Sequence, residues 1–315
     1  MMEAAEQKTY LIPTSVDEAL KMATDNFGAF RYLAGGTDVM VNSFQGNGGA
    51  PCLIDITAIQ ELKGVRTEGD RLRISALHRL EDLKYVETLQ REFPMLIEAA
   101  LHVGAPLLRK TATLGGNVLC ENRCLFYNQS EWWREAVGHC LKCEGDICIA
   151  TQGKKACFSE LVSDTAPALI AMCAEIEVAD TDGIRRMKLE DIYTGDGVRP
   201  RNLSPTAILT AILLPLRRGF RTSFRKLRER QSLDFTSLTT AVSVDSAQHL
   251  RIVLAGVDPR PVLVLGMAGD DRSMLIRRAI TGARTVDNDM YSRGYRRDMI
   301  QVFLDRSLEE LLNDN

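Results

Sequence analysis

The sequence has no long hydrophobic run and no excess of basic charge. Its longest apolar stretch, residues 166–176, contains a proline and is far too short to cross a bilayer, which excludes a helix spanning a membrane. The formal net charge of -3 argues against a nucleic-acid-binding surface, because such surfaces usually carry a basic excess. The start of the chain is acidic and lacks a basic segment followed by an apolar one, so we expect no secretory signal and a cytoplasmic protein.

Common catalytic signatures are also missing. The four histidines show no H-x-x-x-H pairing, and we interpret them as structural or surface residues. The sequence has no G-x-G-x-x-G fingerprint of a Rossmann dinucleotide site and no nucleophile elbow or Ser-His-Asp order. No two carboxylates stand out as a general acid and base. We therefore name no catalytic residue.

The chain does have an ordinary globular composition and one dense group of cysteines. Hydrophobic residues make up 45% and charged residues 26% of 315 positions, enough for two domains or for one large domain with an appendage. Six of the eight cysteines fall between residues 120 and 157, in a polar, irregular segment. Thiols that only pack are scattered through a core, so we interpret this group as metal ligands.

The spacing of these cysteines is compatible with more than one ligand set. A closed tetrahedral zinc site would use two close pairs beside His139: Cys120/Cys124 and Cys140/Cys143. An iron–sulfur cluster needs four thiolates and tolerates long intervals between them, as in the wider set Cys124, Cys140, Cys148 and Cys157. A third interpretation is that the cysteines are free or linked by disulfides. Spacing alone leaves all three open.

The hydrophobic patterns predict an α+β chain. A helix over residues 16–26 follows a capping serine, and strand 30–34 ends in a glycine pair ahead of a helix that begins at Val39. We expect further strands at 52–56, 71–76, 175–179 and 206–214, the second of them half-buried, and helical segments at 80–85, 94–102 and 167–174. After a basic linker at 217–221, a small α+β domain is predicted, with strands 239–245 and 250–257 and helices 271–281 and 291–312.

Two glycine turns, Gly35-Gly36-Thr37-Asp38 and Gly115-Gly116-Asn117, are the main chemical signal. Glycine lets the backbone approach a pyrophosphate closely, and Thr or Asn offers a hydroxyl or amide to an oxygen. Taken singly, each is more often a plain turn.

Two later residues have both a functional and a structural interpretation. Asp164 could accept a hydrogen bond from a ribose or ring group, or could cap the helix that follows it, and we favour the cap. Lys226 could reach the edge of a cofactor, although the charged run around it is typical of a solvated face.

Four motifs in order give the sequence a resemblance to a known family. They are L-A-G-G-T-D-V at 33–39, T-L-G-G-N at 113–117, S-D-T-A-P-A-L at 163–169, and K-L-R at 226–228 with D-F at 234–235. Together they resemble the FAD-binding (medium) subunit of the xanthine dehydrogenase family of molybdenum hydroxylases. The resemblance implies an FAD-binding domain of two subdomains, of the PCMH (vanillyl-alcohol oxidase-like) type, at residues 1–218. It also implies an α+β domain like that of the carbon monoxide dehydrogenase flavoprotein at 219–315.

The segment between the second and third motifs is longer than is usual in this family. Asn117 and Asp164 lie 47 positions apart, and roughly forty residues look inserted. The insert, at 118–160, resembles that of the β subunit of 4-hydroxybenzoyl-CoA reductase, which carries a [4Fe–4S] cluster on cysteines spaced C-x15-C-x7-C-x8-C. The same intervals occur here at Cys124, Cys140, Cys148 and Cys157. The resemblance therefore favours the cluster over zinc. It leaves four cysteines outside the ligand set: Cys52, Cys120, Cys143 and Cys173.

Carried over position by position, the resemblance implies which residues contact FAD. The pyrophosphate loop corresponds to Tyr32, Leu33, Ala34, Gly35, Gly36, Thr37, Asp38 and Val39. The second flavin loop corresponds to Thr113, Leu114, Gly115, Gly116 and Asn117. Asp164 matches an acidic residue near the ribityl and adenosine portion, and Leu209 and Lys226 match residues beside the flavin.

The resemblance further implies an oxidoreductase subunit that transfers electrons within a hetero-oligomer. The partners would be a molybdopterin-containing large subunit and a small subunit with two [2Fe–2S] clusters. As in the reductase, electrons from ferredoxin would enter at the [4Fe–4S] cluster and pass through FAD and the [2Fe–2S] clusters to molybdenum, where an aryl-CoA loses a phenolic hydroxyl. The alternative is a molybdenum hydroxylase subunit that passes electrons outward to NAD or a quinone, with the cysteines as a structural zinc site.

Overall fold

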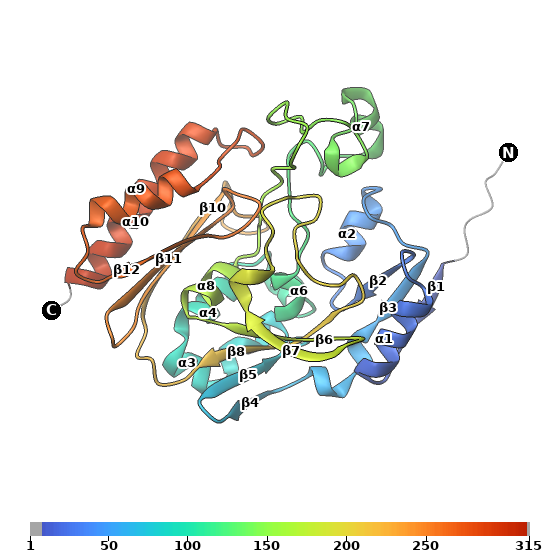
Figure 1. The fold of residues 1–315 in the computed structure, drawn as a ribbon, viewed down its shortest axis with the longest axis horizontal. Coiled ribbons are helices and arrows are strands. Elements are labelled where there is room, and N and C mark those ends of the chain that lie inside the picture. Colours follow the sequence, from blue (N-terminus) through green and yellow to red (C-terminus); the bar gives the residue numbers. More distant parts are fainter. Residues whose placement is uncertain (1–7, 314–315) are drawn as a thin grey trace.

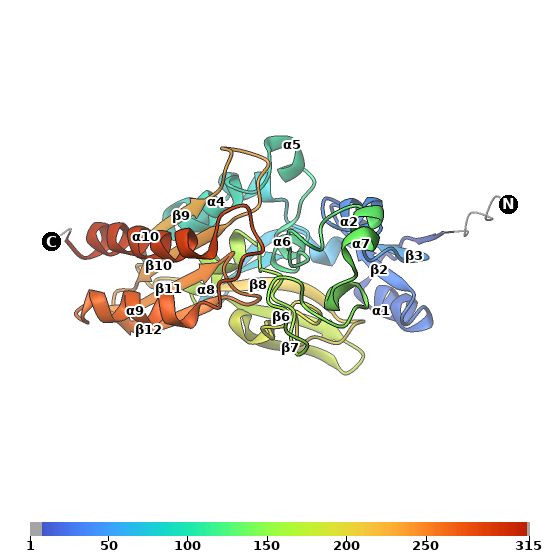
Figure 2. The same cartoon turned by 90° about the horizontal axis from the view of Figure 1, so that it is seen from above.

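The computed structural model describes residues 8–313 and contains three β-sheets, one after another along the length of the molecule (Figure 1). A five-stranded sheet occupies the centre, and the N-terminal and C-terminal sheets lie on either side of it. Strand β1 (Thr9–Leu11) and helix α10 (Arg293–Asn313) lie at opposite ends of the molecule (Figures 1 and 2). The first six residues, on which the expected lack of a secretory signal rests, lie outside the described part.

The N-terminal sheet is parallel, in the order β1 (Thr9–Leu11), β3 (Cys52–Asp55), β2 (Phe30–Leu33). Helix α1 (Val16–Asp25) begins as predicted, because the Ser15 hydroxyl accepts a hydrogen bond from the Glu18 N–H at 3.1 Å. Helix α2 (Val39–Phe44) leads from β2 back towards β3, as parallel neighbours require. The first glycine pair therefore lies at the carboxyl end of β2, ahead of α2.

The central sheet is antiparallel, in the order β4 (Val65–Glu68), β5 (Arg71–Ser75), β8 (Ile208–Pro215), β6 (Glu175–Asp180), β7 (Gly183–Lys188). Residues 71–75 form a strand as predicted, but the expectation that this strand is half-buried is wrong, because positions 72–75 are all buried. Leu72 and Ile74 belong to the hydrophobic core on one face of the sheet, and Arg73 on the other face is enclosed by Glu68 and Glu177. The buried Arg73 is compensated by an ion pair with Glu177 on β6.

Short helices cover one face of this sheet: α3 (Glu87–Glu92), α4 (Pro94–Leu101), α5 (Pro106–Arg109), α6 (Leu114–Val118) and α8 (Thr165–Ala171) (Figure 1). Single 3₁₀ turns complete the chain at Ile56–Ala58, Gln60–Leu62, Leu80–Tyr85, Leu141–Cys143 and Leu189–Ile192. Residues 80–85, expected to be helical, therefore form a 3₁₀ turn. The second glycine motif is the short helix α6 rather than a turn.

The C-terminal sheet is antiparallel, in the order β12 (Val262–Met267), β11 (His249–Ala255), β10 (Leu238–Val244), β9 (Arg221–Leu227). Helices α9 (Arg272–Gly282) and α10 (Arg293–Asn313) cover its outer face (Figures 1 and 2). Strands β9 and β12 were not predicted. On the inner face, Ala241, Val253 and Ala255 belong to the same hydrophobic core as α8. The hydrophobic core thus continues past residue 218. The predicted boundary between two domains at this residue stays a prediction.

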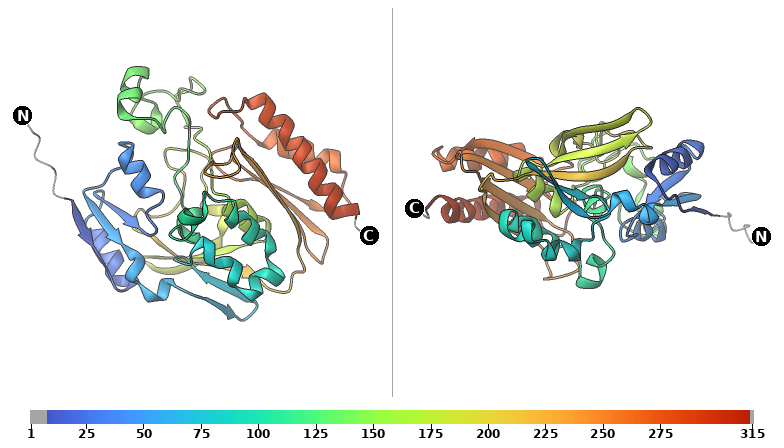
Figure 3. Two further views of the ribbon diagram at one scale, coloured as in Figure 1. Left: turned by 180° about the vertical axis from the view of Figure 1, so that it is seen from behind. Right: turned by 90° about the horizontal axis from the view of Figure 1, so that it is seen from below.

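The cysteine segment runs between α6 and α8 and is mostly irregular, apart from α7 (Glu131–Val137) and one 3₁₀ turn. It projects from the central part of the molecule on the side of α2 (Figures 1 and 3). Throughout residues 8–313, none of the helices combines the length and the apolar character needed to cross a membrane.

Candidate functional site

The first glycine loop offers unused backbone donors. Within residues 8–313, the N–H groups of Gly35, Gly36, Thr37 and Asp38 have no hydrogen-bond acceptor. Gly36 adopts φ +71°, a left-handed conformation that favours glycine. Consecutive free amides between a strand and a helix form a concave donor surface suited to an anion. This loop therefore fits the pyrophosphate of a dinucleotide.

In the second glycine motif, unlike the first, the backbone N–H groups are bonded within the protein. Thr113 caps α6, its hydroxyl accepting a hydrogen bond from the Gly116 N–H at 3.1 Å. The Gly115 N–H donates to the carbonyl oxygen of Ala76 at 2.9 Å, and a Cβ on Gly115 would lie 2.8 Å from the Cβ of Ala76. These amides are thus already bonded within the protein, and Gly115 is required for close packing.

The first glycine motif contacts the backbone just before the second one. A Cβ on Gly35 would lie 2.0 Å from the carbonyl oxygen of Thr111, a distance that no side chain tolerates. Asn117, at the end of the second motif, accepts hydrogen bonds through Oδ1 from the Ser163 hydroxyl at 2.9 Å and the Thr165 hydroxyl at 2.6 Å. Three motifs far apart in the sequence therefore meet at one place.

Asp164 does not cap α8, so the interpretation favoured from the sequence is wrong. The Ser163 hydroxyl accepts from the Ala166 N–H at 3.0 Å, whereas Asp164 makes no capping bond. Asp164 Oδ2 accepts a hydrogen bond from Lys226 Nζ at 2.7 Å, and its Oδ1 is buried without a partner in the described structure. Burial raises the pKa of Asp164, while the attraction of Lys226 opposes that shift.

Lys226 is not on a solvated face. Its side chain is 0% exposed, and its ammonium also donates to the carbonyl oxygens of His102 and Asp234, each at 3.1 Å. An ammonium has three donors, so Lys226 is saturated by protein oxygens. The sequence could not predict that Lys226 is buried, because it lies in a run of charged residues and its partners come from distant segments.

His102, which the sequence left as a structural or surface residue, lies beside this buried ion pair. Burial, with the positive charges of Arg228, Lys226 and Arg109, lowers the pKa of His102 to about 4. Its Nδ1 is buried and lacks a partner among residues 8–313. Leu209, in contrast, is 4% exposed and belongs to the hydrophobic core. The same core includes Leu114 of the second glycine motif, and a contact of Leu209 with the flavin stays a prediction.

The remaining predicted residues of the first loop are half-buried. The Tyr32 hydroxyl donates to the carbonyl oxygen of Thr206 at 2.8 Å. Asp38 Oδ2 accepts from the Glu121 N–H at 2.9 Å, and Oδ1 forms an ion pair with Arg123. Asp38 therefore fixes the first glycine loop to the beginning of the cysteine segment, a connection that the sequence pattern did not indicate.

The four cysteines with the reductase-like intervals line one cavity. They are Cys124, Cys140, Cys148 and Cys157. Cys120 and Cys143, which the zinc interpretation needs, are not part of the lining. Among the residues that the structure describes, no three His, Cys, Asp or Glu side chains are grouped to hold a single metal ion. Four thiols around one cavity can instead supply the thiolates of an iron–sulfur cluster.

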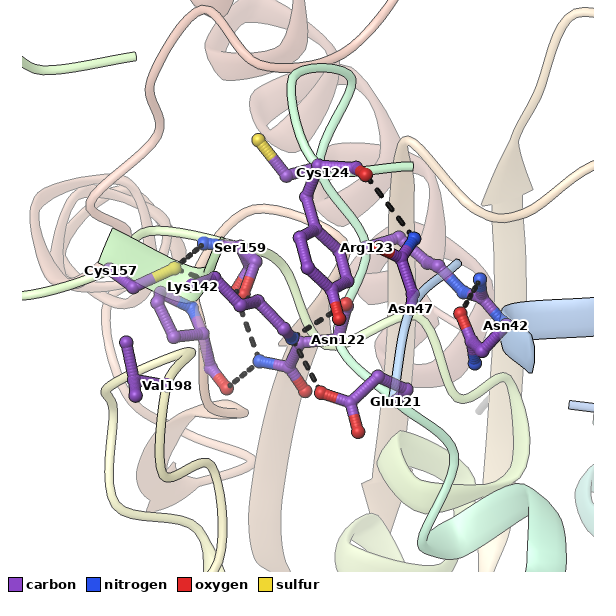
Figure 4. Close-up of polar contacts among 12 residues, drawn as sticks. Asn42, Asn47, Glu121, Asn122, Arg123, Cys124, Lys142, Cys157, Ser159 and Val198 are labelled. Carbon is purple, nitrogen blue, oxygen red and sulfur yellow. Dashed lines mark hydrogen bonds and ion pairs between the residues drawn. The ribbon is translucent and has the colours of Figure 1, made fainter. Parts of the chain in front are cut away.

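The environment of two of these thiols, Cys124 and Cys157, disfavours their ionisation. Burial raises the pKa of Cys124 to about 12 and also raises that of Cys157. Hydrogen bonds between Cys157 and Ser159, together with the charge of Lys142, lower the pKa of Cys157 and so oppose the effect of burial (Figure 4). Lys142 and Ser159 were not predicted as functional residues, because each is an isolated polar residue among the cysteines.

Comparison with known proteins bears on the flavin-binding part of the chain. Residues 4–217 match the family described as the FAD binding domain in molybdopterin dehydrogenase. The aldehyde oxidoreductase FAD-binding subunit PaoB of Escherichia coli K12 is 28% identical over 246 residues, which are 73% of this chain and 76% of PaoB. The nicotinate dehydrogenase FAD-subunit of Eubacterium barkeri is 26% identical over 219 residues, 68% of this chain and 61% of that subunit.

The fold is shared with a solved structure over the full length. A chain of Cu,Mo-CO dehydrogenase in its cyanide-inactivated form superimposes with a TM-score of 0.77 over 99% of both chains, at 22% identity. The family match covers well over half of this sequence. The protein therefore belongs to the FAD-binding domain family of the molybdopterin dehydrogenases and is an oxidoreductase subunit.

Proposed function

We propose that this protein binds FAD and transfers electrons within a molybdenum enzyme. The observation that carries the proposal is the row of free amides at Gly35–Asp38, and it is supplemented by the buried Oδ1 of Asp164, which has no partner among residues 8–313. When bound, FAD exchanges electrons singly or in pairs. The first loop, residues 32–39, would hold the pyrophosphate, and Asp164 would accept a hydrogen bond from the ribityl or adenosine portion.

The structure supports the other proposed FAD-binding residues to different degrees. Lys226 acts by holding Asp164 in place, because its three donors are already used. Residues 113–117 support the first loop, and the exposed Gly116 is their best-placed contact with a ligand. Leu209 has the support of the resemblance alone. The two-subdomain PCMH-type domain at 1–218, with an insert at 118–160, belongs to the same proposal.

We further propose that Cys124, Cys140, Cys148 and Cys157 bind a [4Fe–4S] cluster. The shared cavity supports this ligand set, because it includes these four cysteines and leaves out Cys120 and Cys143. Such a cluster would supply one-electron transfer next to the flavin-binding loops.

Substitution of one cavity cysteine tests the cluster. Cys148→Ser should remove iron and the broad visible absorbance of the cluster from anaerobically purified protein, while FAD stays bound. Cys143→Ser is the matched control, since Cys143 lies in the same segment outside the cavity lining, and it should retain both iron and FAD. Unchanged iron in Cys148→Ser, or zinc in place of iron in the wild type, contradicts the proposal.

For the whole enzyme we propose an aryl-CoA reductase resembling 4-hydroxybenzoyl-CoA reductase. Its other parts would be a molybdopterin-containing large subunit and a small subunit with two [2Fe–2S] clusters. The relatives support a hetero-oligomer, because they are named as FAD-binding subunits or, in carbon monoxide dehydrogenase, as a medium chain. The cysteine spacing supports the reductase.

In a second candidate, electrons leave the enzyme. Two of the relatives belong to enzymes that are named dehydrogenases, of nicotinate and of carbon monoxide. In that case the flavin would pass electrons outward to NAD or a quinone, and the cysteines would form a structural zinc site.

The electron donor distinguishes the two candidates. In the anaerobic complex, we expect reduced ferredoxin to bleach the flavin absorbance and to support reduction of 4-hydroxybenzoyl-CoA, whereas NADH does neither. Molybdenum, iron and flavin should be counted in the same preparation. Rapid bleaching by NADH, with no reaction of the aryl-CoA, supports the outward direction and contradicts the reductase.

A further inference from the structure

Lys142 is a buried cation at the cysteine cavity. Its side chain is 5% exposed and lines the same cavity as the four cysteines. The ammonium lies 2.5 Å from Glu121 Oε1 and donates to the carbonyl oxygen of Asn122 at 3.0 Å. It also lies over the ring of Tyr127, 4.8 Å from the ring centre. Burial of a charge is unfavourable unless it is paired, so this position is fixed by specific contacts.

A single hydroxyl connects this cation to a cavity thiol. Ser159 Oγ lies 3.4 Å from Lys142 Nζ and 3.4 Å from Cys157 Sγ, and the Ser159 N–H donates to the same sulfur at 3.4 Å (Figure 4). The surroundings leave little freedom, because a Cβ on Gly197 would lie 1.9 Å from Ser159 Oγ and 2.8 Å from Cys157 Sγ. The ammonium of Lys142, the hydroxyl of Ser159 and the sulfur of Cys157 are therefore held in fixed positions, with the hydroxyl between the other two.

The partner of Lys142 lies on the side of the first glycine loop. Glu121 donates its N–H to Asp38 at 2.9 Å, while its carboxylate pairs with the ammonium. Figure 4 shows Lys142 between Cys157 with Ser159 on one side and Glu121 on the other. Glu121 is not part of the cavity lining, so the positive member of the pair is the nearer one.

We propose that the Lys142–Glu121 pair sets the reduction potential of the iron–sulfur cluster, with Lys142 raising it and Glu121 limiting the rise. This inference rests on the proposed [4Fe–4S] site. Reduction by one electron, without a proton and with no bond made or broken, makes the cluster and its four thiolates more negative by one charge. A buried cation beside the ligands stabilises that reduced form, and a carboxylate destabilises it. The hydrogen bond that the Ser159 N–H donates to Cys157 Sγ acts in the same direction as Lys142.

The sign of the shift separates this role from a structural one. An ion pair that only held the segment together would be broken equally by the loss of either partner. An electrostatic role predicts opposite shifts, because one substitution removes a positive charge and the other a negative one.

The experiment is a dithionite titration of the anaerobic complex, with redox mediators, in which the reduced cluster is followed by electron paramagnetic resonance. Lys142→Met should shift the cluster potential to a more negative value, and Glu121→Gln to a more positive one. Lys142→Arg, which keeps the charge, should remain close to the wild type. Lys154→Met is the control, because Lys154 is exposed and belongs to the same segment without lining the cavity.

Each result has a defined meaning. Wild-type protein without iron would remove the proposed cluster itself, and this inference with it. Suppose that the wild-type protein contains iron, but that the cluster potential of Lys142→Met and Glu121→Gln shifts in the same direction or does not shift. This result overturns the tuning role alone and leaves the proposed cluster intact. If Lys142→Met fails to retain iron, the sign in Glu121→Gln decides. Loss of iron from both variants shows that the pair is a structural support and also overturns the inference.

Discussion

At Gly35 the absence of a side chain allows two distant loops to touch. The backbone of Gly35 is so close to the carbonyl group of Thr111 that even a methyl group would overlap with it. The sequence identified Gly35 from its motif and predicted a close approach to a ligand. The structure adds a second reason for glycine, a protein contact, which no local pattern could indicate because Thr111 comes much later in the chain.

We expect Gly35→Ala to separate the loops and to weaken FAD binding. An added Cβ would lie 2.0 Å from the Thr111 oxygen, so the backbone must move. Overpacking of this kind typically costs about 1–3 kcal/mol in the free energy of unfolding. The ratio of flavin to protein absorbance in the purified variant, together with urea unfolding, measures both effects.

Gly269→Ala is the control for this substitution. A Cβ at Gly269 meets nothing within 4 Å, so neither the flavin content nor the stability should change beyond the ordinary effect of an exposed substitution. If Gly35→Ala binds FAD as fully as the control does, the first loop does not need its contact with Thr111 to bind the cofactor.

Among the elements, those with a strong periodic or capping signal were predictable. Helix α1 has Ser15 as its cap, and α9 and α10 occupy nearly the predicted ranges. Strand β9 was missed because its charges resemble a solvated face. These charges have partners from distant segments: Arg225 pairs with Glu310 on α10, and Lys226 with Asp164. A local window contains none of these partners.

The cysteine segment depends on the C-terminal unit for its position. Buried Arg296 on α10 forms an ion pair with Glu160, just after the last cavity cysteine, and donates to the carbonyl oxygen of Gly256 at 2.9 Å. The side chain of Asn288 donates to the carbonyl oxygen of Phe158 at 2.8 Å. The sequence predicted the four cavity cysteines from their intervals. It could not predict this support, because its members are single residues near the end of the chain.

Over the whole molecule, the Asp164–Lys226 pair joins the central unit to the C-terminal sheet. Asp164 precedes α8, and Lys226 lies on β9. We expect Lys226→Met to destabilise the protein by about 3–5 kcal/mol, because it leaves a buried carboxylate without its counter-charge. Urea unfolding of the purified protein measures this loss, and the flavin content is recorded in parallel.

A double variant separates stability from binding. Replacement of a buried ion pair by two apolar residues is often close to neutral, so Lys226→Met combined with Asp164→Leu should recover much of the lost stability. FAD binding should not recover with it, because the carboxylate oxygen left without a partner, Asp164 Oδ1, is then absent. A double variant that is stable and also binds FAD as the wild type does would exclude Asp164 as a contact of the cofactor. One as unstable as the single variant would instead mean that the charges themselves hold the two units together.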